Sequence, residues 1–265
     1  MKNLVLINGV TGAIGSACLA QFSRNPNNTI YGFARRARIY QFFLKNGAMP
    51  DATLVCSLGS DIIRGLRDLL SKVDRSQYER VVYVHALGVY PTEIDMDGVI
   101  RVSNDHDEDG IDDRVMTLSY EVFFGALDTL VQMELPTQAI IFGGLSDKHQ
   151  PLVHQSWWKV MEKMKKRGME VVGAQSGFGL TLLNVSSVMG PNDLMTRPFV
   201  FRDTDATAHC WLMPHEVAEA VERLTSGDRT GFQECELFHR AGYFKQGYYE
   251  GEGFTDRKKR ELGIL

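Results

Sequence analysis

The sequence predicts an α/β protein whose core is a doubly wound parallel sheet of about seven strands, with helices on both faces. Three observations support this fold class. Short apolar runs such as residues 4–7 lack polar alternation, as expected for strands covered on both faces. Segments with helical periodicity separate these runs along the chain. A glycine-rich stretch lies between the first expected strand and the first expected helix.

The predicted elements alternate in the order that a parallel sheet requires. Strands are expected at residues 4–7, 29–34, 52–56, 80–85, 138–142, 180–185 and 234–238. Helices are expected at residues 16–22, from about 37, and at 62–73, 115–133, 153–167 and 214–225. Residues 91–113 are acidic and contain Asp-Gly turns, which indicates either a lid or a solvated surface loop. No repeat, low-complexity tract or linker divides residues 1–265, so a single domain is expected.

Composition and charge argue against several classes of partner. A net charge of −4 and a pI near 6.0 give no basic surface, so no nucleic acid is expected to bind. No apolar run approaches the roughly 20 residues of a membrane helix, and the first apolar run is too short for a signal peptide. The scattered cysteines lack metal-ligand spacing, which predicts reduced thiols, no metal site and a cytoplasmic location. They are Cys18, Cys56, Cys210 and Cys235.

The strongest chemical signal is the loop Asn8-Gly9-Val10-Thr11-Gly12-Ala13-Ile14-Gly15. Glycines at this spacing permit a tight turn, close approach of a pyrophosphate and close packing of a helix on a strand. The start of the helix also directs free N–H groups and a positive dipole end at phosphates. A dinucleotide is therefore expected here, and the alternative is a glycine-rich turn without a ligand. The expected contacts come from Gly9, Thr11, Gly12, Ala13, Ile14 and Gly15.

Two arginines indicate which dinucleotide binds. Arg35 and Arg36 follow the second expected strand, where an NAD-selective fold carries an acidic residue for the ribose 2′-hydroxyl. Guanidinium groups instead suit a 2′-phosphate through forked, charge-assisted hydrogen bonds. The sequence therefore favours NADP(H) over NAD(H). The alternative is that both arginines are solvated surface charges.

On these motifs the sequence resembles the short-chain dehydrogenase/reductase superfamily, particularly its extended or atypical, epimerase-like branch. That branch carries a Thr-Gly-x-x-Gly-x-x-Gly loop, and Asn8 replaces its threonine. The likeness covers nearly the whole chain. Ser57 and Leu58 fall where the family flanks the adenine, and residues 85–88 fall where its Asn-Ala-Gly segment lines the cofactor. The resemblance thus implies that Ala86 and Gly88 contact the cofactor.

The same resemblance implies the remaining organisation. Residues 183–191 look like the sixth strand with its Gly-Pro exit, and residues 213–218 look like the start of the late helix. A Rossmann-type NAD(P)-binding domain is implied, in which residues 190–235 contribute a small cap beside a small-molecule substrate. Family members are often dimers or tetramers built on two long helices, so a homodimer is a candidate assembly.

The catalytic residues of the family are only partly present. The family uses a serine after the fifth strand and a Tyr-x-x-x-Lys motif, in which the lysine lowers the tyrosine pKa and holds the nicotinamide ribose. Lys159 matches the motif lysine, but Gln155 occupies the tyrosine position. The serine position falls at residues 143–144, and the nearest hydroxyl is that of Ser146. The family's structural asparagine has no clear match at residues 119–122.

Three functions are compatible with this altered motif. The first is an NADP(H)-dependent oxidoreductase, or an epimerase or dehydratase-like relative, in which Lys159 binds the ribose, Ser146 polarises a carbonyl and His154 supplies the proton. His149 and Tyr90 are further candidates for that proton. Each of these side chains also has an ordinary explanation as a surface or packing residue.

The second function is a reaction without a protein acid, or a non-redox isomerase, cyclase or lyase on the same fold. The third is a non-catalytic sensor or scaffold that binds NADP(H). Trp157 and Trp158 would then serve an interface, although packing in the core or in a dimer is the simpler role for them.

Overall fold

The structure is a computed structural model that describes residues 2–35, 52–56, 59–88, 92–94, 100–102, 116–144, 155–185, 188 and 212–238. At residues 35, 52–56, 59–60, 92–94, 100–102 and 155–158 it describes the backbone alone.

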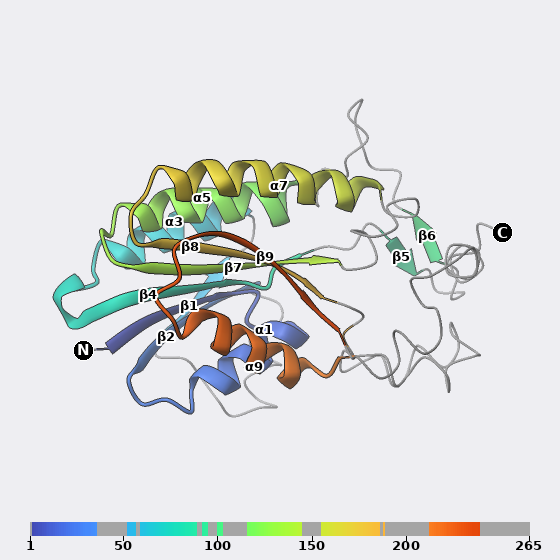
Figure 1. Cartoon of the computed structure of the whole chain (residues 1–265). Helices are drawn as coiled ribbons and strands as arrows, with labels where there is room; N and C mark the ends of the chain where they lie inside the picture. The colour runs from blue at the N-terminus through green and yellow to red at the C-terminus, as the bar shows by residue number, and fades with distance from the viewer. Residues whose placement is uncertain are drawn as a thin grey trace.

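Seven strands form one sheet in the order β3-β2-β1-β4-β7-β8-β9 (Figure 1). Every neighbouring pair in this sheet is parallel. The strand order changes direction at β1, because β2 pairs with one edge of β1 and β4 with the other. The strands are β1 (Lys2–Asn8), β2 (Asn28–Arg35), β3 (Ala52–Cys56), β4 (Tyr78–His85), β7 (Thr137–Gly144), β8 (Phe178–Val185) and β9 (Gly231–Leu237).

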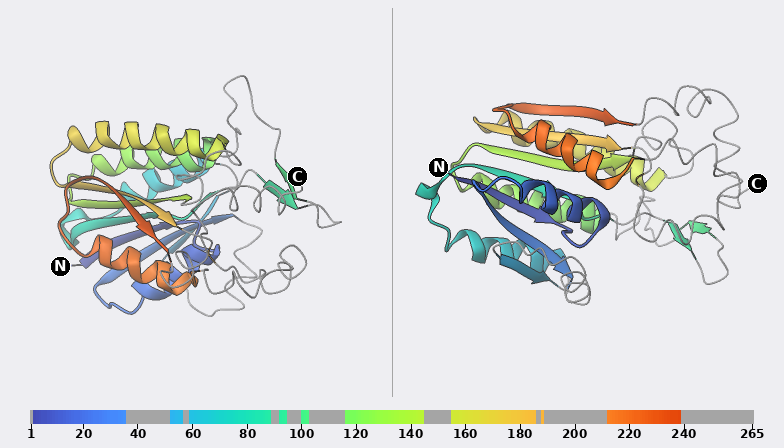
Figure 2. Two further views of the ribbon diagram at one scale, coloured as in Figure 1. Left: turned by 45° about the vertical axis from the view of Figure 1, so that its right-hand side comes forward. Right: turned by 90° about the horizontal axis from the view of Figure 1, so that it is seen from below.

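Helices cover both faces of the sheet, as Figures 1 and 2 show. On one face lie α1 (Ala13–Phe22) and α9 (Pro214–Thr225), which pack against each other. On the other face lie α3 (Gly59–Leu70), α5 (Val122–Val131) and α7 (Gln155–Gly173). The predicted doubly wound α/β fold is therefore confirmed, including its seven strands.

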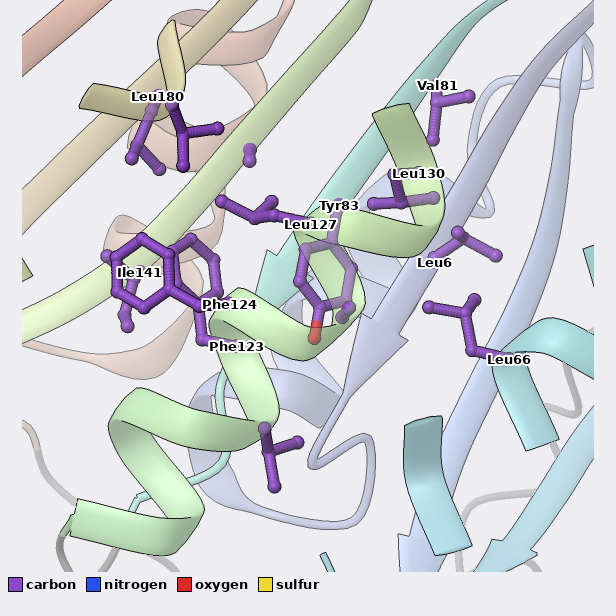
Figure 3. Packing of buried hydrophobic residues seen from close by; sticks show 14 of the residues in the cluster. Leu6, Leu66, Val81, Tyr83, Phe123, Phe124, Leu127, Leu130, Ile141 and Leu180 are labelled. Carbon is purple, nitrogen blue, oxygen red and sulfur yellow. The ribbon is translucent and has the colours of Figure 1, made fainter. Parts of the chain in front are cut away.

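Each face of the sheet has its own apolar core, because the strands are buried on both sides. On the α3, α5 and α7 side, Leu127 and Phe123 of α5 are fully buried against the strands. Figure 3 shows this cluster, in which the ring of Tyr83 stacks on Phe123 with centroids 5.8 Å apart. On the α1 and α9 side, the smaller core includes Val5 of β1 and Val217 of α9.

Two elements have their predicted bounds. The structure places β3 at Ala52–Cys56 and α9 at Pro214–Thr225. Pro214 lies in the first turn of α9, where its fixed φ is favourable and its missing N–H costs nothing. The Glu216 carboxylate accepts a 2.7 Å hydrogen bond from the Met213 backbone N–H, which also favours a helix start at this point.

The helix predicted at residues 153–167 is α7, which continues to Gly173. Its predicted end was wrong because Gly168 does not terminate the helix. A Cβ at Gly168 would lie 2.8 Å from Leu180 and 2.9 Å from Phe232, so the glycine lets α7 pack closely on β8 and β9.

The helix predicted at residues 115–133 also differs in detail. It begins with the π-helical turn η2 (Met116–Glu121), which continues directly into α5. After α5, Glu134 has a φ of 57°, a left-handed conformation that ends the helix.

Two short strands lie inside the stretch that was expected to be a lid or a surface loop. β5 (Thr92–Ile94) and β6 (Ile100–Val102) pair antiparallel, and both lie beyond the carboxyl ends of the main strands (Figure 1). The rest of residues 91–113 lies outside the described residues. Of the expected cap at 190–235, the described residues 212–235 form α9 and most of β9 in the core fold.

The core predicts a clear difference between two adjacent positions on α5. Leu127 is fully buried, and its neighbour Asp128 is exposed. Leu127→Ala should lower the free energy of unfolding by about 2–5 kcal/mol, because it leaves a cavity under the sheet. Asp128→Ala should change it by less than about 0.5 kcal/mol. Urea denaturation of both variants measures this, and equal losses would contradict the described packing.

Candidate functional site

The loop between β1 and α1 is a tight turn in which the backbone packs against other backbone. Gly9 has a φ of 79°, which favours glycine, and a Cβ there would lie 2.6 Å from the Ala86 carbonyl oxygen. The Gly12 N–H donates to the Gly9 oxygen at 2.9 Å and closes the turn. A Cβ on Gly15 would overlap the same Gly9 carbonyl. Gly9 and Gly15 therefore have the roles that their spacing predicted: a tight turn and close packing of the helix.

The start of α1 leaves three backbone donors without helical acceptors. The first helical hydrogen bond runs from the Ser16 N–H to the Gly12 oxygen at 2.9 Å. The N–H groups of Ala13, Ile14 and Gly15 precede it and have no carbonyl within the helix. Among the described residues, no side chain caps this helix, and no acidic residue lies in its first turn. The dipole and these free donors favour an anion at this end of α1.

The loop lies where ligands bind in doubly wound folds, at the carboxyl ends of the strands beside the change in strand order. The Ala86 N–H donates to the Asn8 oxygen at 2.8 Å, and the Gly9 N–H donates to the Phe33 oxygen at 3.0 Å. These bonds join the ends of β1, β2 and β4. The structure thus brings the predicted residues 9–15 next to Ala86, which Leu87 and Gly88 follow in the chain.

Several predicted cofactor contacts are only partly described or not described. The backbone of Arg35 ends β2, beside Cys56 of β3 and one strand from the glycine loop. Arg36, Ser57 and Leu58 lie outside the described residues.

A buried polar network that the sequence did not reveal lies beneath the glycine loop. The Nδ1 atom of His85 lies 3.1 Å from Asn8 Nδ2 and 3.0 Å from the Tyr83 hydroxyl. Its Nε2 atom lies 2.9 Å from the backbone oxygen of Leu118 in η2. His85, Asn8 and Tyr83 are each about 1% exposed. The one available sequence signal was a histidine that follows the run of residues 81–84, Val-Val-Tyr-Val.

The protonation state of His85 follows from its partners and its burial. A backbone carbonyl only accepts, so Nε2 carries the proton and donates to Leu118. Nδ1 then accepts from the Asn8 amide and the Tyr83 hydroxyl. Burial lowers the pKa of His85 to about 4, although the hydrogen bond to Leu118 opposes that shift. Burial also raises the pKa of Tyr83, so both groups are neutral at pH 7.

The predicted catalytic residues lie on or near α7. Lys159 is partly exposed, and the adjacent Val160 and Met161 are buried. The backbone of Gln155 begins α7, four residues before Lys159. Ser146 and His154 lie outside the described residues. The same holds for His149 and Tyr90, while Trp157 and Trp158 are described by their backbone alone.

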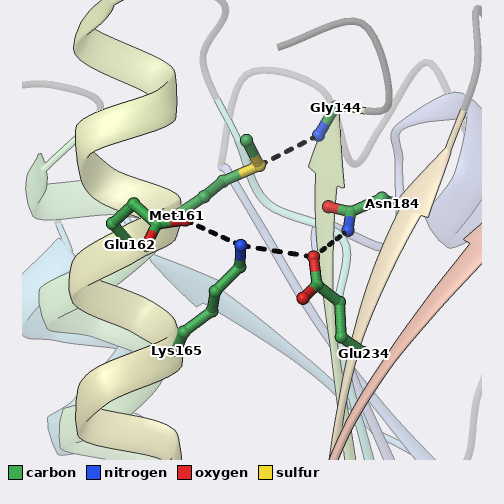
Figure 4. Close-up of polar contacts among 6 residues, drawn as sticks. All are labelled: Gly144, Met161, Glu162, Lys165, Asn184 and Glu234. Atoms are coloured by element: carbon green, nitrogen blue, oxygen red, sulfur yellow. Dashed lines mark hydrogen bonds and ion pairs between the residues drawn. The ribbon is translucent and has the colours of Figure 1, made fainter. Parts of the chain in front are cut away.

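The serine position of the resembled family has no room for a side chain at Gly143. A Cβ there would overlap the Asn184 Oδ1 atom and lie 2.8 Å from the Met161 sulfur. The Gly144 N–H donates to the same sulfur at 3.4 Å, as Figure 4 shows. At Gly143, therefore, a thioether and an amide fill the place that a serine hydroxyl would need.

The fully buried Asn184 also joins α7 to the edge of the sheet. Its Nδ2 atom donates to Glu234 on β9 at 2.7 Å. The Lys165 ammonium group lies 3.3 Å from the same carboxylate and 2.7 Å from Glu162 (Figure 4). These contacts hold α7 against β8 and β9.

The described part of the chain also bears on membranes and metals. None of its helices is both long enough and apolar enough to cross a membrane. Within residues 2–238, apart from the undescribed gaps, no cluster of three or more His, Cys, Asp or Glu side chains is arranged to hold a metal.

Comparison with known proteins supports the fold. No protein-family model matches the sequence, and no curated protein sequence matches it. Solved structures do match: serine dehydrogenase complexed with NADP+ has a TM-score of 0.62 at 12% identity, over 89% of this chain and 94% of that one. MalC reductase/Diels-Alderase from Malbranchea aurantiaca has a TM-score of 0.64 at 16% identity, with 89% and 95% covered. A short-chain dehydrogenase/reductase from Serratia marcescens has 0.64 at 13%, with 89% and 96% covered. The chain therefore shares the fold of these structures.

The buried imidazole predicts a specific pH dependence of stability. The pKa of His85 is about 4 in the folded protein against 6.5 for an unperturbed histidine. Below pH 6.5 the unfolded chain binds a proton that the folded chain does not, so the stability contributed by neutral His85 falls as the pH drops toward 4. The loss should reach about 2–3 kcal/mol. Urea denaturation at pH 7.5 and 4.5 should show this loss in the wild type and not in His85→Gln. Equal losses in both proteins would contradict it.

The crowding at Gly143 predicts that even a methyl group is not tolerated there. Gly143→Ala should lower the free energy of unfolding by about 1–3 kcal/mol, because Asn184 and Met161 must move. Gly173, the last residue of α7, has nothing within 4 Å of its added Cβ and is the control. Gly173→Ala should leave the stability unchanged or slightly higher. Thermal denaturation measures both, and an unchanged Gly143→Ala variant would show that the site is open.

Proposed function

We propose that this chain binds NADP(H) across the carboxyl ends of β1 and β4 and acts as an oxidoreductase on a small organic molecule. The observation that carries the proposal is the backbone geometry of the glycine loop. Gly9 and Gly15 bring the loop, the β4 exit and the start of α1 together, and three N–H groups at that start remain without helical acceptors. Such a set of donors suits the diphosphate of a dinucleotide.

Preference for the 2′-phosphorylated cofactor rests on the end of β2. Arg35 ends this strand beside β1, on the side of the loop where the adenine ribose lies in doubly wound folds. Arg35 and Arg36 supply two positive charges there in place of an acidic residue. Ser57 and Leu58 would flank the adenine, as the resemblance implies. The NADP+ in the serine dehydrogenase structure is consistent with this choice.

The proposed chemistry at the other end of the cofactor involves α7. Lys159 would bind the nicotinamide ribose, Ser146 would polarise the substrate and His154 would exchange the proton that Gln155 cannot. The crowding at Gly143 supports this relocation, because a serine at that position would displace Asn184 and Met161. The epimerase-like branch, the cap at 190–235 and a homodimer are further parts of the proposal that rest on the resemblance.

A second candidate function is a non-redox reaction on the same fold, such as isomerisation, cyclisation or elimination. The absence of space for a serine at Gly143 favours it, since it removes one of the usual positions for a carbonyl-polarising group. The name of the MalC reductase/Diels-Alderase shows that one structure of similar fold combines reduction with a cycloaddition.

Titration of the protein with reduced nucleotides tests the proposed cofactor. NADPH should bind in the micromolar range or tighter and more tightly than NADH, measured as enhanced nucleotide fluorescence on binding. Arg35→Glu should lower the affinity for NADPH at least tenfold and reverse the preference for NADPH over NADH. The reason is that the change replaces a charge-assisted contact with repulsion of the 2′-phosphate. Gly15→Val should abolish binding of both nucleotides, because its side chain would enter the turn.

Lys72, an exposed residue after α3, supplies the matched charge control for Arg35. Lys72→Glu should leave both affinities unchanged. If wild-type protein binds neither nucleotide, the proposed function is wrong. If Arg35→Glu keeps the wild-type preference, the assignment of the 2′-phosphate site is wrong while the dinucleotide site stands.

A further inference from the structure

Three separate elements meet on the ring of His85. The residue ends β4 and lies in register opposite Asn8, which ends β1 and immediately precedes Gly9. Its Nδ1 atom is bonded to Asn8 at 3.1 Å, and its Nε2 atom is bonded to Leu118 of η2 at 2.9 Å. Phe123 of α5 packs edge-on against the ring at a centroid distance of 5.3 Å. One side chain thus connects the glycine loop with the helix that follows β4.

The bond to Leu118 coincides with the π-helical form of η2. A side chain that enters the hydrogen-bond ladder of a helix can widen one turn into a π-helix, and such turns occur frequently at functional sites. Here Leu118 is central in η2, and its oxygen accepts from the His85 ring. Because burial lowers the pKa of His85 to about 4, the ring keeps one donor and one acceptor at neutral pH. Both contacts are therefore maintained together.

Two buried polar atoms beside this connection have no partner among the described residues. They are the Oδ1 atom of Asn8 and the hydroxyl of Ser119, which follows Leu118 in η2. Both residues are 1% exposed. A buried polar group without a partner costs about 1–3 kcal/mol, so its retention calls for a ligand or a water that completes it.

The position of η2 indicates beside which half of a bound dinucleotide it would lie. Arg35 on β2 lies on one side of β1, and His85 on β4 lies on the other. With the diphosphate at the glycine loop and the adenine toward β2, the other half of the molecule extends over β4 toward β7. η2 contacts α3 and α7, so it is located on the sheet face beside that half.

We propose that His85 is a positioning residue for the nicotinamide half of the cofactor, because it ties Asn8 at the glycine loop to Leu118 in η2 and so fixes the wall formed by that turn. The inference rests on the proposed binding of NADP(H). Without the bond to Leu118, η2 can relax to an α-helical turn. That change removes one residue from the turn and rotates the preceding residues by about 100° around the helix axis. Ser119 and Met116, which belong to this turn, then change their positions.

Two variants that differ by one methylene group isolate the bond to Leu118. In His85→Asn the amide can still accept from Asn8 and Tyr83, but it is too short to reach the Leu118 oxygen. In His85→Gln the longer amide supplies an acceptor and also a donor near the position of Nε2. Thr129→Val, which removes a buried 3.0 Å hydrogen bond to Gly125 within α5, controls for general loss of stability in this helix.

Isothermal titration calorimetry should be performed with NADPH and with adenosine 2′,5′-bisphosphate, which carries only the adenine half. His85→Asn should weaken the affinity for NADPH at least tenfold. It should change the affinity for the bisphosphate by less than twofold. His85→Gln should restore the affinity for NADPH to within threefold of the wild-type value. Thr129→Val should bind both ligands with the wild-type affinities. Hydrogen exchange of the backbone amides of residues 116–121 should become faster in His85→Asn than in the wild type. In His85→Gln and Thr129→Val the exchange rates of these amides should stay unchanged.

Other results separate the two proposals. If wild-type protein binds neither molecule, the proposed function fails. A second result is that the wild-type protein binds both ligands while His85→Asn lowers both affinities equally or lowers neither of them. That result overturns the positioning role of His85, while the cofactor site remains. Failure of His85→Gln to restore NADPH affinity also overturns it, because the lost affinity then does not depend on the bond to Leu118.

Discussion

Gly9 brings the first loop of the chain into direct contact with the backbone that leaves β4, and a Cβ on Gly9 would lie 2.6 Å from the Ala86 oxygen. The rest of the site depends on this approach. It allows Ala86 to bond to Asn8, holds the ends of β1 and β4 together and sets the start of α1 above them. Because the contact joins backbone to backbone, neither partner can adjust by changing a rotamer. The free N–H groups of α1 consequently have a fixed position and direction.

Beneath that contact, the apolar core contains a polar network that is almost completely excluded from water. His85 bonds to Asn8, Tyr83 and Leu118, and each bond compensates part of the cost of burying a polar group. Hydrogen bonds depend on direction, whereas the surrounding apolar contacts do not. The network therefore specifies how β1, β4 and η2 lie relative to one another. The start of the glycine loop and the turn η2 are thus connected through one imidazole ring.

The opposite side of the site shows why the fold alone does not define the chemistry. Solved structures at 12–16% identity share the architecture and include a dehydrogenase and a reductase/Diels-Alderase. In this chain Gly143 is enclosed by Asn184 and the Met161 sulfur, so a family serine does not fit there. The neighbouring pair Lys165 and Glu234 secures α7 through charge-assisted contacts at the sheet edge.

The order along the chain of the seven strands of the main sheet and of the helices α1, α3, α5, α7 and α9 was determined by the sequence alone, because strand and helix periodicity, Pro214 at a helix start and the glycine spacing are local signals. The tertiary structure decided what depends on contacts between distant residues. Asn8 and His85 are 77 positions apart, so no local pattern could pair them. Likewise, the close packing of Gly168 on Leu180 and Phe232, and the contact of His85 with the Leu118 carbonyl, join residues that are distant in the chain. Side-chain partners come from packing, and packing is a property of the whole fold.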